Sequence, residues 1–293
     1  MIHRRLAAVV SAFAAVAFSC SFGPLRATAA GIGVPAPTGM TASDIVNLAN
    51  AYATGANVAL GRYGPQLAES VRVKSPQQAT AVEGKVRRLV TFKRYQGSHV
   101  PGKLADLYLR DHPSANRAAI ATYFDNELEA FATAIGSPNR ERMVDISSAE
   151  ALLVAQSYYS FDADQPSDAT SYRILRALAG LSLSNQQKSG SWPDGSKQDL
   201  FDTFAIMAES LVSISEDARH RGDDKTFEQI HLAAGSILRD RFGVDPTKTK
   251  VDRIICVVYR DQPCDRVLAR ARIAFGGATT SPAGAAAPAA PAH

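Results

Sequence analysis

Residues 114–135, SANRAAIATYFDNELEAFATAI, are the stretch that decides the fold class. Its large apolar residues recur at steps of three and four, which places them on one face of a helix. They are Ile120, Phe124, Leu128, Phe131 and Ile135. Ser114 is a suitable N-cap, and Gly136 and Pro138 are expected to end the helix. The stretch therefore predicts a long amphipathic helix.

Helical signals continue on both sides of this stretch. Ser147 and Glu150 have the spacing of a capping box, and Ser167 or Asp168 is expected to cap the next helix. Further helices are predicted at 41–60, 76–95, 103–110, 196–221 and from Asp223 to Gly243.

Residues 251–259 are compact and rich in β-branched side chains, so a short strand and a buried helix both fit them. Because no partner strand is evident, the helix is favoured. The whole pattern predicts an all-α fold, a single irregular bundle of about seven to nine helices.

The first 29 residues have the three parts of a secretory signal peptide. Arg4 and Arg5 give a positive start, an apolar run follows at 6–18, and an A-x-A site stands at 27–29. A run of about thirteen residues is too short to span a bilayer, which takes about twenty. We therefore expect cleavage after Ala29 or Ala30, a periplasmic or secreted protein, and no transmembrane segment in the mature chain.

Cys20 closes the apolar run, which raises the alternative of a lipoprotein. The bulky Phe18, two residues before it, fits a lipidation signal poorly. Lipidation at Cys20 is therefore not favoured.

The predicted domain organisation follows from composition. Residues 30–40 are expected to be a linker, 41–275 the helical domain, and 276–293 a disordered tail rich in Ala, Pro and Gly. The precursor has 32 basic and 28 acidic residues, and the leader holds three of the basic ones and no acid. The mature chain is thus close to neutral, which argues against nucleic acid as a partner.

Two cysteines remain after removal of the leader, Cys256 and Cys264. In an oxidising compartment such a pair is most simply a disulfide, and two free buried thiols are the alternative. A zinc site is not expected, because a structural zinc needs four ligands.

No common catalytic or nucleotide-binding motif is present in the sequence, so no cofactor is expected. Asp125, Glu127 and Glu129 lie on the helix at 114–135 and could supply an acid–base pair for glycoside hydrolysis. A solvated helix face explains them better. A basic run is the candidate anion-binding surface, with one polar helix face as the simpler interpretation. It comprises Lys85, Arg87, Arg88, Lys93 and Arg94, interleaved with Phe92 and Tyr95.

Residues 195–206, GSKQDLFDTFAI, carry a resemblance to a known group of proteins. With 149–160 and 238–246, this pattern resembles an uncharacterised bacterial family of secreted helical domains of unknown function. The resemblance covers roughly residues 40–255 and implies an exported all-α domain with no known activity. Lys197 and Gln198 match its pattern at a helix start, where helix capping is one interpretation and function is the other.

These observations favour a non-enzymatic, exported helical interaction protein of the cell envelope. Its partner is expected to be an envelope or extracellular protein, with weak contact to anionic envelope polymers. Two alternatives stay open. One is a cell-envelope hydrolase that uses carboxylates, and the other is a bundle that binds a lipid or small molecule.

Overall fold

The structure is a computed structural model that describes residues 37, 40–45, 47–48, 86–95, 97–134, 144–187, 191–258 and 262–275. Helices account for its regular structure in these residues, and the one bridge pairing among them joins Thr91 to Asp145. The all-α prediction is confirmed. The predicted signal peptide, Cys20, Lys85 and the C-terminal tail lie outside the described residues.

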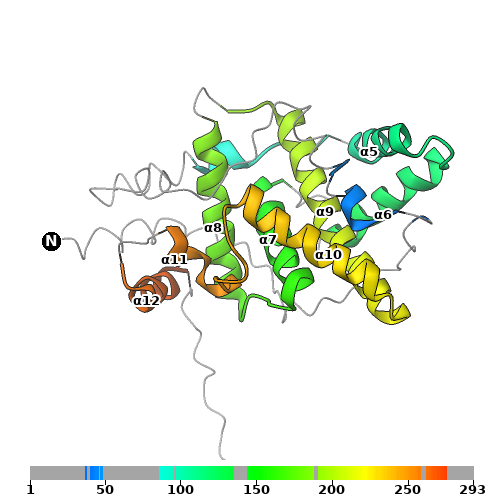
Figure 1. The fold of residues 1–293 in the computed structure, drawn as a ribbon. Helices are drawn as coiled ribbons and strands as arrows, with labels where there is room; N and C mark the ends of the chain where they lie inside the picture. The colour runs from blue at the N-terminus through cyan, green and yellow to red at the C-terminus, as the bar shows by residue number, and fades with distance from the viewer. Residues whose placement is uncertain are drawn as a thin grey trace, which may run out of the picture.

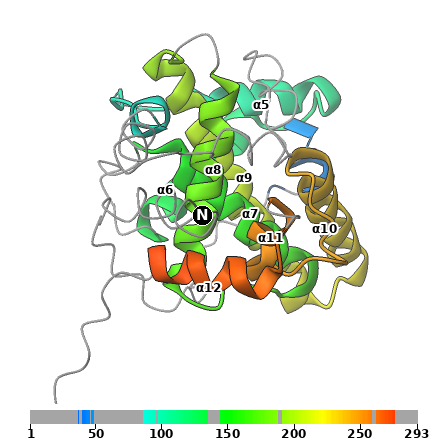
Figure 2. The same ribbon diagram turned by 90° about the vertical axis from the view of Figure 1, so that its left-hand side faces the viewer.

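Helix α9 is the centre of the bundle (Figure 1). Helices α6, α7 and α10 pack directly against it, α8 packs against α7, and α11 and α12 pack against α8 (Figure 2). The helices are α5 (Val100–Asp111), α6 (Arg117–Ala134), α7 (Ile146–Asp162), α8 (Ala169–Gln186), α9 (Asp194–Arg221), α10 (Asp224–Ser236), α11 (Ile254–Val258) and α12 (Cys264–Phe275). A π-helical turn, Ile237–Arg241, extends α10, and a 3-10 turn, Val251–Arg253, precedes α11.

The predicted apolar stripes form the core. On α6, Ile120, Phe124, Leu128 and Phe131 are all buried. On α9 the inward face of Phe201, Phe204, Ala205, Ala208, Leu211 and Ser215 is buried as well. These faces join one continuous apolar cluster, which also includes residues of α7, α8 and α10.

Two predicted helix starts are each wrong by two residues. Helix α6 is capped by Asn116, whose side-chain oxygen accepts the N–H groups of Ala118 and Ala119 at 3.0 and 3.2 Å, and Ser114 is not the cap. Helix α7 is capped by Asp145, which accepts the N–H of Ser147 at 2.9 Å. Asn and Asp cap helices as well as Ser does, so a nearby Ser does not decide the start.

The helix predicted at 76–95 ends earlier than expected, at Val90. Its part before residue 86 lies outside the described residues. Residues 91–95 are not helical, and their side chains alternate between inward and outward, as in extended backbone: Phe92 is buried, Lys93 exposed, Arg94 half-buried and Tyr95 exposed. Thr91 bridges to Asp145, and Phe92 donates its N–H to the carbonyl of Val144 at 3.0 Å. Pairing with a segment about fifty residues away therefore overrides the local helical preference.

The predictions for residues 251–258 and for the cysteine pair are confirmed. Residues 251–258 are helical rather than a strand. The sulfur atoms of Cys256 and Cys264 lie 2.08 Å apart, and the bond joins α11 to the first residue of α12. Among the described helices, none is both long and apolar enough to cross a membrane.

Candidate functional site

A segment of the chain lies across the N-terminal turns of α9 and carries most of the predicted basic run. It consists of a helical turn at 86–90 followed by extended backbone at 91–95. We refer to residues 86–95 as the basic strap. Its position is set by four polar side chains of α9, which are Asp194, Lys197, Gln198 and Asp202.

Lys197 binds the end of the helical turn in the strap. Its ammonium donates to the carbonyl of Thr91 at 2.9 Å and to that of Arg88 at 3.2 Å. The last carbonyls of a helix lack intrahelical partners and carry the negative end of the helix dipole, so a cation stabilises them. Burial lowers the pKa of Lys197, while the nearby Asp194 carboxylate acts in the opposite direction.

Gln198 and Asp194 bind the backbone of the extended part. The Gln198 side-chain oxygen accepts the N–H of Tyr95 at 2.7 Å, and its amide donates to the carbonyl of Gly97 at 2.8 Å. Asp194 accepts the N–H of Lys93 at 3.1 Å. These side chains replace the neighbouring strand that extended backbone usually needs.

Asp202 completes the attachment through a charged side chain. Its carboxylate lies 2.7 Å from the guanidinium of Arg94, and the Asp202 side chain is 0% exposed. The guanidinium also lies 5.8 Å from the centre of the Phe201 ring. Two charges removed from water are costly to separate, so this pair strongly specifies where the strap lies.

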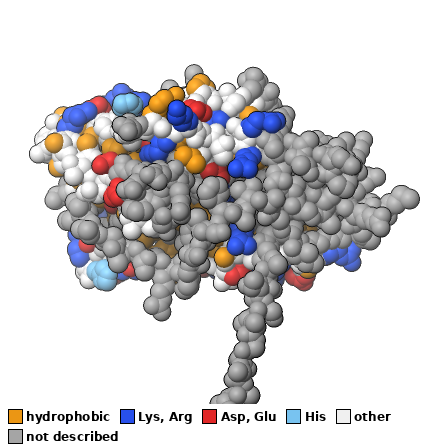
Figure 3. Space-filling model, turned by 180° about the vertical axis from the view of Figure 1, so that it is seen from behind, with side chains coloured by type: hydrophobic (Ala, Val, Ile, Leu, Met, Phe, Trp, Pro, Cys, Tyr) orange, Lys and Arg blue, Asp and Glu red, His pale blue; other side chains and the backbone are white. Residues whose placement is uncertain are grey.

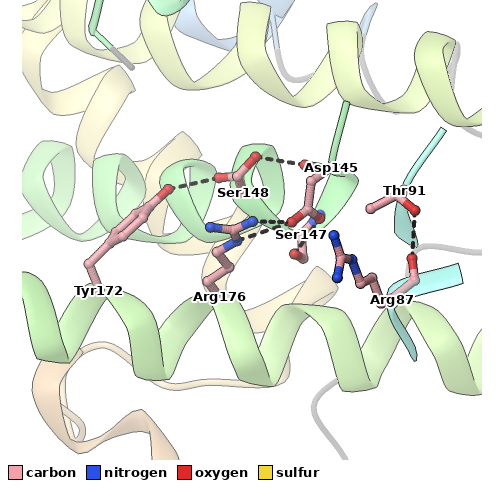
Figure 4. Close-up of polar contacts among 7 residues, drawn as sticks. All are labelled: Arg87, Thr91, Asp145, Ser147, Ser148, Tyr172 and Arg176. Atoms are coloured by element: carbon pink, nitrogen blue, oxygen red, sulfur yellow. Dashed lines mark hydrogen bonds and ion pairs between the residues drawn. The ribbon is translucent and has the colours of Figure 1, made fainter. Parts of the chain in front are cut away.

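The other edge of the strap meets the N-terminus of α7 (Figure 4). There Asp145 accepts from Nε of Arg176 at 3.1 Å, and the Arg87 side chain extends toward the same carboxylate. The Ser148 hydroxyl donates to the Asp145 carbonyl at 2.6 Å, and Tyr172 donates to the Ser148 carbonyl at 3.0 Å. The strap is thus held between α9, α7 and α8.

The structure divides the predicted anion-binding residues into two groups. Arg87, Arg88 and Lys93 are exposed, whereas Arg94 turns inward to Asp202. Lys85 lies outside the described residues. A single helix face was the simpler expectation, but extended backbone sends successive side chains to opposite sides, which separates Lys93 from Arg94.

A second polar cluster lies between α6 and the middle of α9. Glu127 on α6 is buried, so the expectation of a solvated face is wrong for this residue, although Asp125 and Glu129 are exposed. The Glu127 carboxylate accepts the hydroxyl of Ser213 at 3.0 Å. Glu209 on α9 is also buried, and no motif in the sequence marks it.

Both glutamates titrate far above their ordinary range. Burial raises the pKa of Glu127 to about 7, partly opposed by the hydrogen bond from Ser213. Burial and the adjacent charge of Glu127 raise the pKa of Glu209 to about 8. Burial, together with Glu127, also raises the pKa of the Tyr123 hydroxyl. The cluster therefore holds protons near neutral pH in a place closed to solvent.

This cluster differs from a metal centre. Among the residues that the structure describes, no group of three or more His, Cys, Asp or Glu side chains is placed to hold a metal ion. Burial and the hydrogen bond from Ser213 to Glu127 define the surroundings of its two carboxyl groups instead.

The model of a known protein family matches residues 7–253, which is most of the chain. The chain belongs to DUF6683, a family of unknown function. The DUF6683 match includes the strap, both polar clusters and α9, and it stops before Cys256. It starts well before residue 40, where the resemblance was expected to begin. No curated protein and no solved structure matches the chain.

The strap explains the residues that carried the resemblance. In residues 197–206 three of the polar residues, Lys197, Gln198 and Asp202, bind the strap. The apolar positions Leu200, Phe201, Phe204, Ala205 and Ile206 are all buried in the core. The pattern in this DUF6683 member thus specifies an attachment between two parts of the fold.

Replacing Lys197 with methionine is expected to loosen the strap. The change leaves the carbonyls of Arg88 and Thr91 without this donor, at a cost of about 1–3 kcal/mol in the free energy of unfolding. Amide hydrogen exchange in residues 86–95 should accelerate, while exchange in α10 should not. Lys103→Met is the matched control, because Lys103 is an exposed lysine paired with Asp199. Unchanged exchange in the strap of the Lys197→Met variant would contradict the assigned role.

Proposed function

We propose that this DUF6683 chain is an exported, non-enzymatic interaction protein of the cell envelope. The observation that carries the proposal is the use of Lys197, Gln198 and Asp202 to hold the strap. Catalytic side chains need access to a substrate, whereas these three point into the protein. By holding the strap in place, they fix a stretch of surface that faces outward. A binding protein requires such a surface.

Export is supported by the charged, apolar and A-x-A parts of residues 1–29. The bond between Cys256 and Cys264 is in keeping with an oxidising compartment. We propose processing after Ala29 or Ala30, a mature domain at 41–275, and a periplasmic or secreted location.

The test is recovery of the full chain from a bacterium that has an outer membrane. We expect periplasmic or secreted protein that begins at Ala30 or Gly31 by intact mass. Its two cysteines should not react with a thiol reagent until a reductant is added. Cytoplasmic protein that retains Met1 and two reactive thiols would refute export.

A carboxylate-dependent hydrolase is the competing function. The buried position of Glu127 and Glu209 counts against it, because a polysaccharide would have to separate α6 from α9 to reach them. Incubation with peptidoglycan and polysaccharides is expected to give no cleavage. Cleavage that is lost in Glu127→Gln or Glu129→Gln would replace our proposal with the hydrolase.

The third function is a bundle that binds a lipid or small molecule. The apolar faces of the described helices pack against one another in one cluster, which favours a filled core over a ligand cavity. A ligand that co-purifies in native mass spectrometry would support this function instead.

A further inference from the structure

The outer face of the basic strap differs from the rest of the described surface in its charges. Basic side chains elsewhere mostly lie beside an acid, and Figure 3 shows Lys and Arg mixed with Asp and Glu on the face seen from behind. Ion pairs with acids are formed by Lys103, Arg117, Arg219, Arg221, Lys248, Lys250, Arg253 and Arg272. Arg87, Arg88 and Lys93 are exposed within one short segment and form no ion pair with a described residue, although the Arg87 side chain points toward Asp145. Arg110, Lys225, Arg239 and Arg266 are also exposed without such a pair, but they are scattered along the chain. Residues 86–95 contain no acid at all.

An aromatic side chain lies among these cations. Tyr95 is 59% exposed, and only Leu232 is a comparably exposed large apolar side chain among the described residues. Tyr and Arg are enriched where proteins bind partners, so an exposed tyrosine among cations suits a binding surface.

The backbone that carries these side chains is held by side chains of α9. The N–H of Lys93 is bound by Asp194, and the N–H of Tyr95 is bound by Gln198. Phe92 is buried and Arg94 pairs with Asp202, so the side chains between the outward ones anchor the strap. A surface held in this way loses little conformational entropy when a partner binds.

The spacing of the cations indicates the shape of the partner. Arg87 and Arg88 are consecutive on a helical turn, so their side chains diverge by about 100°. Lys93 lies further along, on the extended part. Divergent cations cannot close around one small anion, but they can contact successive charges of a polymer. Guanidinium groups suit phosphate as they suit carboxylate, because they can donate two parallel hydrogen bonds to either.

We infer that the outer face of the strap, formed by Arg87, Arg88, Lys93 and Tyr95, binds a phosphate-bearing sugar polymer of the cell envelope. The cations contact successive phosphates, and the Tyr95 ring lies against the sugar between them. The choice of polymer rests on the proposed export, whereas binding by these residues can be measured in solution wherever the protein resides.

The experiment measures the affinity of the mature chain, which is the full chain without its signal peptide, for purified lipopolysaccharide at low salt. The test variant carries Arg87→Gln, Arg88→Gln and Lys93→Gln. Each cation near an anionic surface contributes about a fivefold gain in affinity, so the triple variant is expected to bind about 100-fold more weakly. Tyr95→Ala should weaken binding in addition, without altering its salt dependence.

A charge-matched control carries Arg117→Gln, Lys248→Gln and Lys250→Gln, which removes three exposed cations elsewhere. It should bind within about threefold of the unmodified chain, since these cations already have partners. Thermal unfolding of both variants should match that of the unmodified chain, because all six positions are exposed.

Four outcomes would overturn the inference. The first is that the unmodified chain does not bind lipopolysaccharide. The second is that the control loses as much affinity as the strap variant, because that result would show an effect of net charge alone. Equal binding of dephosphorylated lipopolysaccharide or polygalacturonate would refute phosphate recognition. Capture of an acidic protein through Arg87 and Arg88, without polymer binding, would assign the surface to a protein partner. None of these outcomes bears on export, which the N-terminal mass decides separately.

Discussion

Replacing Arg94 with methionine is expected to lower the free energy of unfolding by about 3–5 kcal/mol. The substitution leaves the Asp202 carboxylate, which is 0% exposed, buried without its 2.7 Å guanidinium partner. Removing a partner of a buried charge is among the most destabilising changes that a single substitution makes. Urea unfolding followed by circular dichroism measures the effect.

Two further variants separate charge from packing. Arg117→Met removes a guanidinium from an exposed pair, whose partners are 56% and 57% exposed, and should cost less than about 1 kcal/mol. Adding Asp202→Asn to Arg94→Met removes the buried negative charge and should recover more than half of the lost free energy of unfolding. If the double variant is no more stable than Arg94→Met, lost packing against Phe201 explains the effect and the charge does not.

The stability of the domain is expected to fall by several kcal/mol between pH 5 and pH 9 because of the Glu127–Glu209 cluster. The pKa of Glu127 rises from 4.5 to about 7 on folding, and that of Glu209 rises from 4.5 to about 8. The folded state therefore binds more protons than the unfolded state across this interval. Stability from these groups is fully present below pH 4.5 and is lost as the pH rises through 7 and 8.

The size of the effect follows from the shift itself. A pKa raised from 4.5 to about 7 corresponds to about 3 kcal/mol for Glu127 alone. Glu209 adds to this, but the two carboxyls interact, so their contributions do not simply sum. Burial raises the pKa of Glu150 on α7 as well, and this group adds to the same trend.

Glutamine substitutions test this directly. Glu127→Gln and Glu209→Gln remove the titration and keep the shape of the side chain, so each variant should flatten the pH profile of unfolding. At pH 9 each should be more stable than the unmodified chain, on the order of 3 kcal/mol. Glu129→Gln, an exposed position on the same helix, is the control and should leave the profile unchanged. A profile of Glu127→Gln that parallels the unmodified chain would refute the assignment.

The two clusters show how far sequence reasoning reaches. Most of the helices, the stripe from Ile120 to Phe131 and the pairing of Cys256 with Cys264 were predicted, because each depends on spacing within a short segment. Helix α12 was not predicted. Amphipathic periodicity and cysteine count are local quantities. The K-Q pattern at 197–198 was also recognised as distinctive, although its role was not.

Long-range contacts were beyond this reasoning. Arg94 and Asp202 are 108 residues apart, and Lys197 and Thr91 are 106 apart. Glu127 looked like part of a solvated face because burial by α9 cannot be deduced from α6 alone. Glu209 gave no signal, since its neighbours on α9 are not distinctive in sequence.

The sequence by itself determined an all-α bundle, the position of its apolar faces and the cysteine pair. Hydrophobic periodicity carries this information, because a face must be buried whatever covers it. Only the tertiary structure decided which charges are neutralised inside and which remain outside. Arg94 and Lys93 are adjacent in the chain, yet the extended backbone of the strap sends one to Asp202 and the other into solvent. The ionisation and availability of a side chain depend on what the fold places beside it, and distant residues supply those neighbours.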